Sequence, residues 1–200
     1  MESYYPGWMA RQEHLLGELL SVRRDDEAAQ RALIARVLDH YHEYYNQKSR
    51  TDVLLLFSPS WLTPLERTFL WAAGWRPSLA FRLLPRATVE PLTAAQASAV
   101  EELRRATAAK EKEVGEGLAR VQEAVASTEM LRLSRGESDG AAGNAAQAVL
   151  AELNALVSAA DAIRADTVNN LVEILTPSQT VDFLAAAARL HIRIRLKLSE

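Results

Sequence analysis

The sequence has 200 residues, of which 48% are hydrophobic and 24% are charged, and its formal net charge is −3. These fractions are ordinary for a folded globular chain, and they exclude a wholly disordered or collagen-like one. The absence of cysteine excludes disulfides, thiolate metal sites and cysteine nucleophiles. The acidic net charge provides no overall positive field that would draw the protein to nucleic acid or to an anionic membrane.

The length predicts a single domain, with residues 1–7 as an N-terminal segment and residues 8–198 as the folded part. The longest uncharged stretch, residues 53–65, is shorter than the about 20 apolar residues that cross a bilayer. The first residues lack the basic-then-apolar pattern of a signal peptide. We therefore expect a protein of the nucleus or cytoplasm, without membrane contact.

Apolar residues recur at intervals of three and four along most of the chain, which is typical of helices. The first long helices are expected at residues 8–22 and about 26–50, followed by a short buried helix at 53–57. The later pattern predicts helices over 93–127, over 144–175 with a break near Asp166, and over 176–198. The chain is therefore expected to fold as an all-α, single-domain helical bundle of about seven to eight helices, with no sheet.

Two local features refine these boundaries. Thr63, Thr93 and Thr176 are each followed three residues later by Glu or Gln, the pattern of a capping box that starts a helix. Residues 134–143 lack apolar periodicity, which predicts a mobile loop at about 132–143.

The helix over 93–127 has a near-heptad apolar stripe, interrupted by Thr107 and Lys110. This stripe is expected to pack along another long helix, either within the chain or across a homodimer. Its acidic residues, among them Glu111, are expected on a solvated charged face.

No phosphate-loop, dinucleotide, zinc-protease or nucleophile-elbow motif is present, so we expect no catalytic residue and no metal site. His40 and His42 lie two positions apart on a helix and cannot bind one ion together. Both are expected on a partly exposed helix surface.

The segment 58–81 is unusual because it holds three of the four tryptophans: Trp61, Trp71 and Trp75. Gly74 is expected to end a helix within it. One interpretation makes the tryptophans core, above Glu66, Arg67 and Arg76 that neutralise one another. The other makes them the wall of a pocket or of a partner groove.

The sequence resembles the plant delay-of-germination (DOG) domain, which also forms the C-terminal half of TGA-type basic-zipper transcription factors. The resemblance is carried by residues 40–48, 52–81, 171–179 and 183–195, and it covers about residues 8–196. It implies a non-enzymatic plant regulatory protein that acts through protein–protein interaction. The processes implied are seed dormancy, abscisic acid signalling and transcription regulation. Direct DNA binding is not expected, because the basic zipper is missing and the net charge is acidic.

The resemblance also implies partners and ligands at particular residues. Glu2, Ser3, Tyr4 and Trp8 match the N-terminal pattern associated with binding of type 2C protein phosphatases, although one extra residue and a Pro-Gly pair interrupt it. Independently of the resemblance, Tyr4, Tyr5 and Trp8 form an aromatic cluster at this end of the sequence. These aromatic residues either anchor a partner or fold back onto the first helix. The family is not expected to need a cofactor, but some members suggest haem, for which His191 and Arg195 are the corresponding residues. The alternative function is thus a ligand-sensing helical domain that binds haem or a fatty acid.

Overall fold

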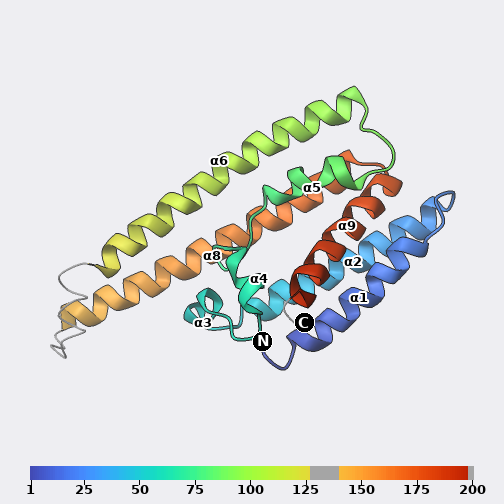
Figure 1. The fold of residues 1–200 in the computed structure, drawn as a ribbon. Helices are drawn as coiled ribbons and strands as arrows, with labels where there is room; N and C mark the ends of the chain where they lie inside the picture. The colour runs from blue at the N-terminus through green and yellow to red at the C-terminus, as the bar shows by residue number, and fades with distance from the viewer. Residues whose placement is uncertain (127–139, 198–200) are drawn as a thin grey trace.

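The computed structural model describes residues 1–126 and 140–197, with side chains for 1–126 and 143–197. Within these residues the chain forms eight helices and one short β-hairpin (Figure 1). The helices are α1 (Tyr5–Ser21), α2 (Glu27–Lys48), α3 (Val53–Phe57), α4 (Pro64–Thr68), α5 (Leu79–Ala87), α6 (Ala94–Val125), α8 (Gly140–Ile174) and α9 (Pro177–Leu196). The prediction of an all-α domain with about seven to eight helices is confirmed.

The last helix, α9, occupies the centre of the arrangement. It contacts α1, α2, α4, α5 and α8. The main apolar core lies between these helices and includes Leu33, Val37, Leu84, Leu171 and Leu184. The two longest helices, α6 and α8, run side by side and extend beyond the rest of the bundle (Figure 1).

The predicted helix starts follow their local chemistry. Thr63, Thr93 and Thr176 each accept a hydrogen bond from the backbone three residues on, and the Glu or Gln at that position bonds back to the cap. Each capping box thus satisfies two donors that the first turn of a helix leaves unpaired. Asp26 and Asp52 cap α2 and α3 in a simpler way, each through a carboxylate oxygen.

The expectation of no sheet is wrong at one place. β1 (Leu70–Trp71) and β2 (Gly74–Trp75) pair in antiparallel fashion, where a helix ending at Gly74 was expected. The two residues between them, Ala72 and Ala73, have φ values of 45° and 59°. Positive φ at both positions is the geometry of a tight hairpin turn, which alanine adopts only when its surroundings hold it there.

Arg164 of α8 holds this hairpin in place. Its guanidinium donates to the carbonyl oxygens of Trp75 at 2.6 Å, Trp71 at 2.5 Å and Ala72 at 3.1 Å, and also to Asp161. The side chain is 5% exposed. A tertiary contact therefore fixes a backbone conformation that local sequence disfavours.

Several predicted boundaries also differ from the structure. α1 begins at Tyr5 rather than residue 8, because Pro6 suits the first turn of a helix. α8 is continuous through Asp166, without the expected break. Of the loop expected at about 132–143, residues 132–139 lie outside the described residues, whereas 140–143 belong to α8. The short helix α3 is only partly buried, since Leu54 and Leu55 are exposed.

The apolar stripe of α6 packs within the chain against α8. Val114 is buried there, and Thr107, which interrupts the stripe, meets Thr167 of α8 with 3.3 Å between the hydroxyl oxygens. Residues 143–174 of α8 are long and apolar enough to span a membrane by length and composition alone. A core helix passes the same test, so this is weak support for a membrane helix. The absence of membrane contact stays a prediction.

The hairpin contact predicts opposite effects for two glycine substitutions. A Cβ atom at Gly74 would lie 2.6 Å from the Arg164 guanidinium carbon, which cannot move without breaking its carbonyl bonds. Gly74→Ala should lower the free energy of unfolding by about 1–3 kcal/mol in urea denaturation. Gly115→Ala, in open space inside α6, should raise it by about 0.5–1 kcal/mol. Equal effects would show that Arg164 does not restrict the hairpin.

Candidate functional site

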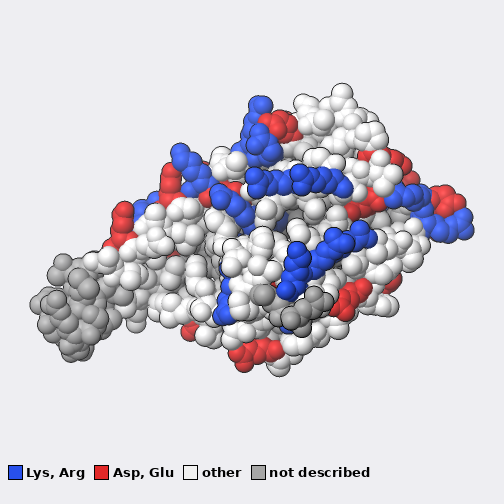
Figure 2. Space-filling model, viewed as in Figure 1, with Lys and Arg blue, Asp and Glu red and all other residues white. Residues whose placement is uncertain are grey.

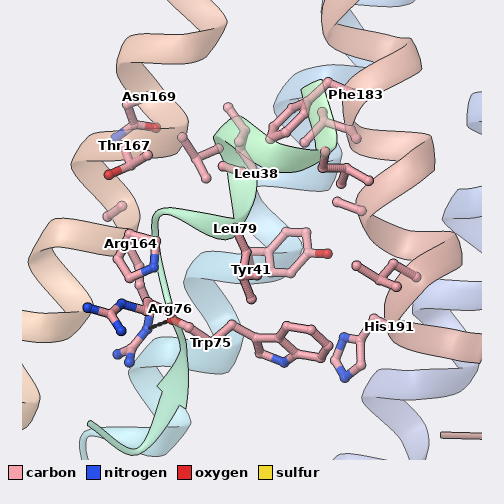
Figure 3. Close-up of a pocket in the computed structure, with 18 of the residues that line it drawn as sticks. Leu38, Tyr41, Trp75, Arg76, Leu79, Arg164, Thr167, Asn169, Phe183 and His191 are labelled. Carbon is pink, nitrogen blue, oxygen red and sulfur yellow. Dashed lines mark hydrogen bonds between the residues drawn. The ribbon is translucent and has the colours of Figure 1, made fainter. Parts of the chain in front are cut away.

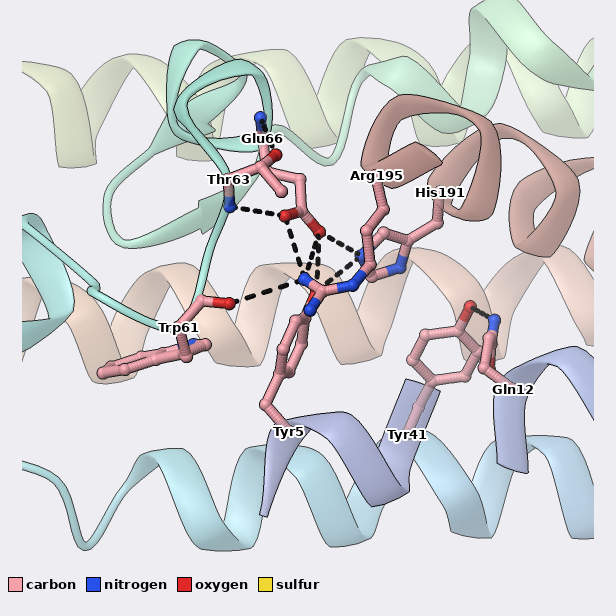
Figure 4. A network of polar contacts seen from close by, with 8 residues as sticks. All are labelled: Tyr5, Gln12, Tyr41, Trp61, Thr63, Glu66, His191 and Arg195. Atoms are coloured by element: carbon pink, nitrogen blue, oxygen red, sulfur yellow. Dashed lines mark hydrogen bonds and ion pairs between the residues drawn. The ribbon is translucent and has the colours of Figure 1, made fainter. Parts of the chain in front are cut away.

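A buried carboxylate, Glu66, joins the beginning, middle and end of the chain (Figure 4). One carboxylate oxygen accepts from the backbone N–H of Thr63 at 2.7 Å, as part of the capping box of α4. Arg195 of α9 donates to the same oxygen at 3.1 Å. The other oxygen accepts from the hydroxyl of Tyr5 in α1 at 2.9 Å.

His191 completes this group, which we call the Glu66 cluster: Tyr5, Glu66, His191 and Arg195. The Nε2 atom of His191 lies 3.0 Å from the Tyr5 hydroxyl and 3.7 Å from Glu66. Because the hydroxyl gives its one proton to Glu66, it accepts a hydrogen bond from Nε2–H of His191. Arg195 also lies over the Tyr5 ring, with its guanidinium carbon 4.9 Å from the ring centre.

The cluster shifts the ionisation of its members in opposite directions. Burial alone would raise the pKa of Glu66, but the neighbouring His191 ring and the hydrogen bonds from Thr63 and Tyr5 outweigh it and lower the pKa to about 2. Burial and the neighbouring Glu66 raise the pKa of the Tyr5 hydroxyl far above its ordinary value. Glu66 is therefore held as an anion and Tyr5 as a neutral donor.

Of the three N-terminal aromatic residues expected to bind a partner, Tyr5 belongs to this cluster and Trp8 lies beside it. Tyr5 and Trp8 are 1% and 4% exposed, and their rings stack 5.8 Å apart. The Trp8 indole donates to the carbonyl oxygen of His40 at 3.1 Å. Tyr4 is half-buried. Tyr5 and Trp8 are thus part of the first helix rather than folded back onto it, and they pack against α2 and α9. Binding of a partner by these residues stays a prediction.

His40 corrects another expectation. Its side chain is fully buried rather than on a partly exposed surface, and its ring stacks on Trp8 with centres 4.5 Å apart. Burial lowers the pKa of His40 to about 4, so the ring stays neutral near pH 7. His42 is exposed, as expected. The buried His40 ring is therefore the surface of α2 against which Trp8 of α1 packs.

A second buried ion pair lies next to the Glu66 cluster. Lys48, at the end of α2, donates to both carboxylate oxygens of Asp161 at 2.7 and 2.9 Å. Asp161 also accepts from Arg164, so one network connects α2, α8 and the hairpin. Burial lowers the pKa of Lys48 to about 8, although Asp161 opposes the shift.

An apolar cavity of about 190 Å³ lies between α2, α5, α8 and α9 (Figure 3). Trp75 and His191 stand side by side at one end of it, with ring centres 5.4 Å apart. A smaller cavity of about 60 Å³ lies on the Glu66 side and shares both residues. Trp75 thus lines both cavities, as the pocket-wall interpretation expects, whereas Trp61 and Trp71 pack against buried apolar clusters, as the core interpretation expects.

The acidic residues of this region pair differently from the sequence expectation. Glu66 bonds to Arg195 of α9, and Arg76 donates to Glu111 at 2.8 Å, so Glu66, Arg67 and Arg76 do not neutralise one another. Glu111 is 3% exposed and also accepts from the backbone N–H of Ser78 at 2.7 Å. It therefore anchors the start of α5 instead of facing solvent.

The residues suggested for haem do not fit the group in this arrangement. The Nε2 atom of His191 lies 3.0 Å from the Tyr5 hydroxyl, so binding iron through this atom would break the contact. Arg195, which would face a propionate, is bound to Glu66. The neighbouring cavity is also smaller than the about 300–1,000 Å³ of ordinary ligand pockets. Among the described residues no group of three or more His, Asp or Glu is placed to hold a metal ion.

Comparison with known proteins identifies the family. The profile of the family described as seed dormancy control (DOG1) matches residues 12–86. Protein DOG1-like 4 of Arabidopsis thaliana is 35% identical over 206 residues, covering 96% of this chain and 89% of the relative. The chain belongs to the DOG1 family. The DOG1 match begins within α1 and runs into α5, so it includes Glu66, His40 and the hairpin, whereas Trp8 precedes it.

Other relatives extend the DOG1 match along the whole chain. Protein RESPONSE TO ABA AND SALT 1 of Arabidopsis thaliana is 30% identical, covering 96% of this chain and 92% of the relative. Transcription factor TGA2.3 of Oryza sativa subsp. japonica is also 30% identical over 96% of this chain, but the chain spans only 61% of that protein. TGA2.3 is named as a transcription factor, and none of these relatives is named as an enzyme.

The sequence singled out Tyr5 and Trp8 as partner-binding and His191 and Arg195 as haem-binding candidates. The structure places all four in or beside the Glu66 cluster. Sequence reasoning missed the residue that joins them, Glu66. The available signal was the capping box at Thr63, which locates Glu66 in a first turn but does not reveal its partners. Lys48 and Asp161, whose pairing spans 113 positions, gave no sequence signal at all.

The low pKa of Glu66 predicts a specific loss of stability in acid. Because the folded pKa lies below the ordinary value of 4.5, the contribution is present above about pH 4.5 and disappears as the pH falls toward 2. Glu66→Gln should therefore lower the free energy of unfolding at pH 7, by on the order of 3 kcal/mol, and flatten its decline in acid. Urea denaturation at a series of pH values measures both. Glu102→Gln, on the exposed surface of α6, is the matched control. An equal pH dependence in both variants would contradict the assignment.

Proposed function

We propose that this protein is a non-enzymatic plant regulator of the DOG1 family that works by binding other proteins. The observation that carries the proposal is the end-to-end similarity to DOG1-like 4 and RESPONSE TO ABA AND SALT 1. The names of these relatives favour seed dormancy or abscisic acid signalling as the process. The similarity to TGA transcription factors favours a role in transcription regulation and a location in the nucleus.

The chemistry of the central cluster supports binding rather than catalysis. Glu66 is an anion already matched by Arg195, Tyr5 and a backbone N–H, and His191 is bound to Tyr5. A general acid or base needs a pKa near the working pH and access to a substrate. Glu66, at a pKa of about 2 and 3% exposed, offers neither.

Type 2C protein phosphatases are the proposed partners of the N-terminal segment. Tyr4 is half-buried, with its hydroxyl enclosed, so it is more accessible to a partner than Tyr5 and Trp8, which must first leave their buried positions. Aromatic residues of this kind are enriched among those that dominate binding energy. Capture of a phosphatase by these residues would then compete with the Glu66 cluster for Tyr5.

This competition predicts opposite effects of two tyrosine substitutions on phosphatase capture. Tyr5→Phe keeps the ring but loses hydrogen bonds to Glu66 and His191, which favours release of the segment by roughly 1.5–3 kcal/mol. Capture in a pull-down with purified type 2C phosphatase should therefore increase about tenfold or more. Tyr4→Ala should weaken capture, because it removes an anchor.

The control is Tyr45→Phe, which loses a hydroxyl on α2 outside the Glu66 cluster. Circular dichroism of each variant establishes that the fold is kept. If neither N-terminal substitution changes the capture of phosphatase, the interface lies on the helical body instead. If the intact protein captures no phosphatase, the phosphatase is not a partner.

A second candidate function is the sensing of an apolar ligand with a single chain, such as a fatty acid. The observation in its favour is the cavity of about 190 Å³, whose lining is mostly apolar and includes Leu38, Leu79, Ala187 and Leu190. A cavity of this size suits a narrow chain better than haem, whose macrocycle needs a larger space. The Glu66 cluster lies next to it and shares His191.

Filling the cavity tests this function. Ala187→Trp places a large ring in the space, so it should abolish the heat of dodecanoate binding in isothermal titration calorimetry. Ala148→Trp, on the exposed surface of α8, should leave it unchanged. Thermal unfolding monitors whether each variant is folded. No heat with the unsubstituted protein, or equal heat in both folded variants, would reject the cavity as a fatty-acid site.

A further inference from the structure

Positive charge is concentrated on two neighbouring helices of this acidic protein. α5 contains Arg82 and Arg86 and no acidic residue. From residue 183 to its end, α9 contains Arg189, Arg193 and Arg195 and again no acidic residue. Since the formal net charge is −3, this segregation leaves the remaining surface correspondingly more negative.

The two helices lie side by side and run in opposite directions. The backbone N–H of Val89, just after α5, donates to Asp182 near the start of α9 at 3.0 Å. At the other end of α5, Leu79 lines the same cavity as Leu190. In Figure 2, Lys and Arg side chains gather over the region of α5 and α9, whereas most acidic ones lie toward the margins.

Four of these arginines form what we call the basic face: Arg82, Arg86, Arg189 and Arg193. All four are exposed, and within the described part of the chain none of them makes an ion pair. Most other arginines of the described surface do pair, for example Arg36 with Glu18 and Arg31 with Glu27, whereas Arg50 and Arg67 do not. The basic face therefore keeps its donors available for a partner that carries negative charge.

Exposed apolar side chains interrupt the basic face. Leu190 is 38% exposed and Leu196 is 54% exposed, and both lie on the same helix as Arg189 and Arg193. Arginine beside an apolar anchor is typical of protein interfaces. A nucleic-acid surface would combine its arginines with further polar groups that contact phosphate, and it would favour a basic protein.

We propose that the basic face of α5 and α9 binds an acidic segment of a partner protein, with an apolar residue of that segment against Leu190. This inference rests on the proposed function only in that the protein acts by binding proteins. It assigns a surface different from the N-terminal segment, because Tyr4 and Tyr5 lie at the start of α1. Charge complementarity sets the kind of partner and the rate of its association.

The test uses a fluorescein-labelled peptide of Asp, Glu and Leu and the full-length protein, with binding followed by fluorescence anisotropy. Saturable binding is expected, and it should weaken as NaCl rises from about 50 to about 200 mM. Replacing all four arginines of the basic face by Gln should weaken binding about tenfold or more. Leu190→Ser should weaken it less, and to the same extent at both salt concentrations.

The matched control removes the same number of positive charges elsewhere: Arg23, Arg31, Arg104 and Arg105 to Gln. All of these are exposed, so both variants are expected to fold, which circular dichroism checks. If both variants bind the peptide equally weakly, binding depends only on the net charge of the protein, and the assignment to the basic face is wrong. A peptide with Asn and Gln in place of Asp and Glu should not bind.

Two further probes separate other classes of partner. Tighter binding to duplex DNA or to phosphatidylserine vesicles than to the acidic peptide, with the same dependence on the four arginines, would overturn the choice of a protein partner. Failure to bind the peptide would reject the basic face but leave phosphatase capture through Tyr4 and Tyr5 untouched. The two proposals therefore fail separately.

Discussion

The fold depends on matching the charge of one buried carboxylate. An unpaired carboxylate in the interior costs several kcal/mol, so Glu66 is tolerated only when its partners are in place. Those partners come from positions 61 residues before it and 129 residues after it, at Tyr5 and Arg195. The first helix, the middle segment and the last helix are consequently linked, because none of them can leave without exposing or stranding this charge.

The same principle explains how the aromatic-rich middle keeps its shape. Between α2 and α5 the chain forms only two five-residue helices and a minimal hairpin, too little regular structure to be stable alone. Polar anchors at both ends compensate: Glu66 fixes α4, and Arg164 holds the hairpin through three carbonyls. Trp75 is thereby positioned between the two cavities by hydrogen bonds to its backbone, while its ring packs against His191.

Features set by neighbouring residues could be predicted from the sequence, whereas features set by distant contacts could not. The capping boxes at Thr63, Thr93 and Thr176 were predicted because donor and acceptor lie three residues apart. The hairpin was missed because two alanines do not normally take positive φ, and Arg164, which holds them, lies about 90 positions away. Glu111 and His40 were placed at the surface because helical periodicity does not show which polar residue a neighbouring element will cover.

The last helix contributes residues both to the buried Glu66 cluster and to the exposed basic face. His191 and Arg195, four residues apart, point toward Tyr5 and Glu66, whereas Arg189 and Arg193 face solvent. A one-turn spacing places each pair on one side of the helix, so the two pairs are rigidly related. Any event that displaces α9 must therefore change both the buried cluster that retains the N-terminal segment and the exposed arginines. A single helix thus carries the side chains that bind Tyr5 and Glu66 on one side and two arginines of the basic face on the other.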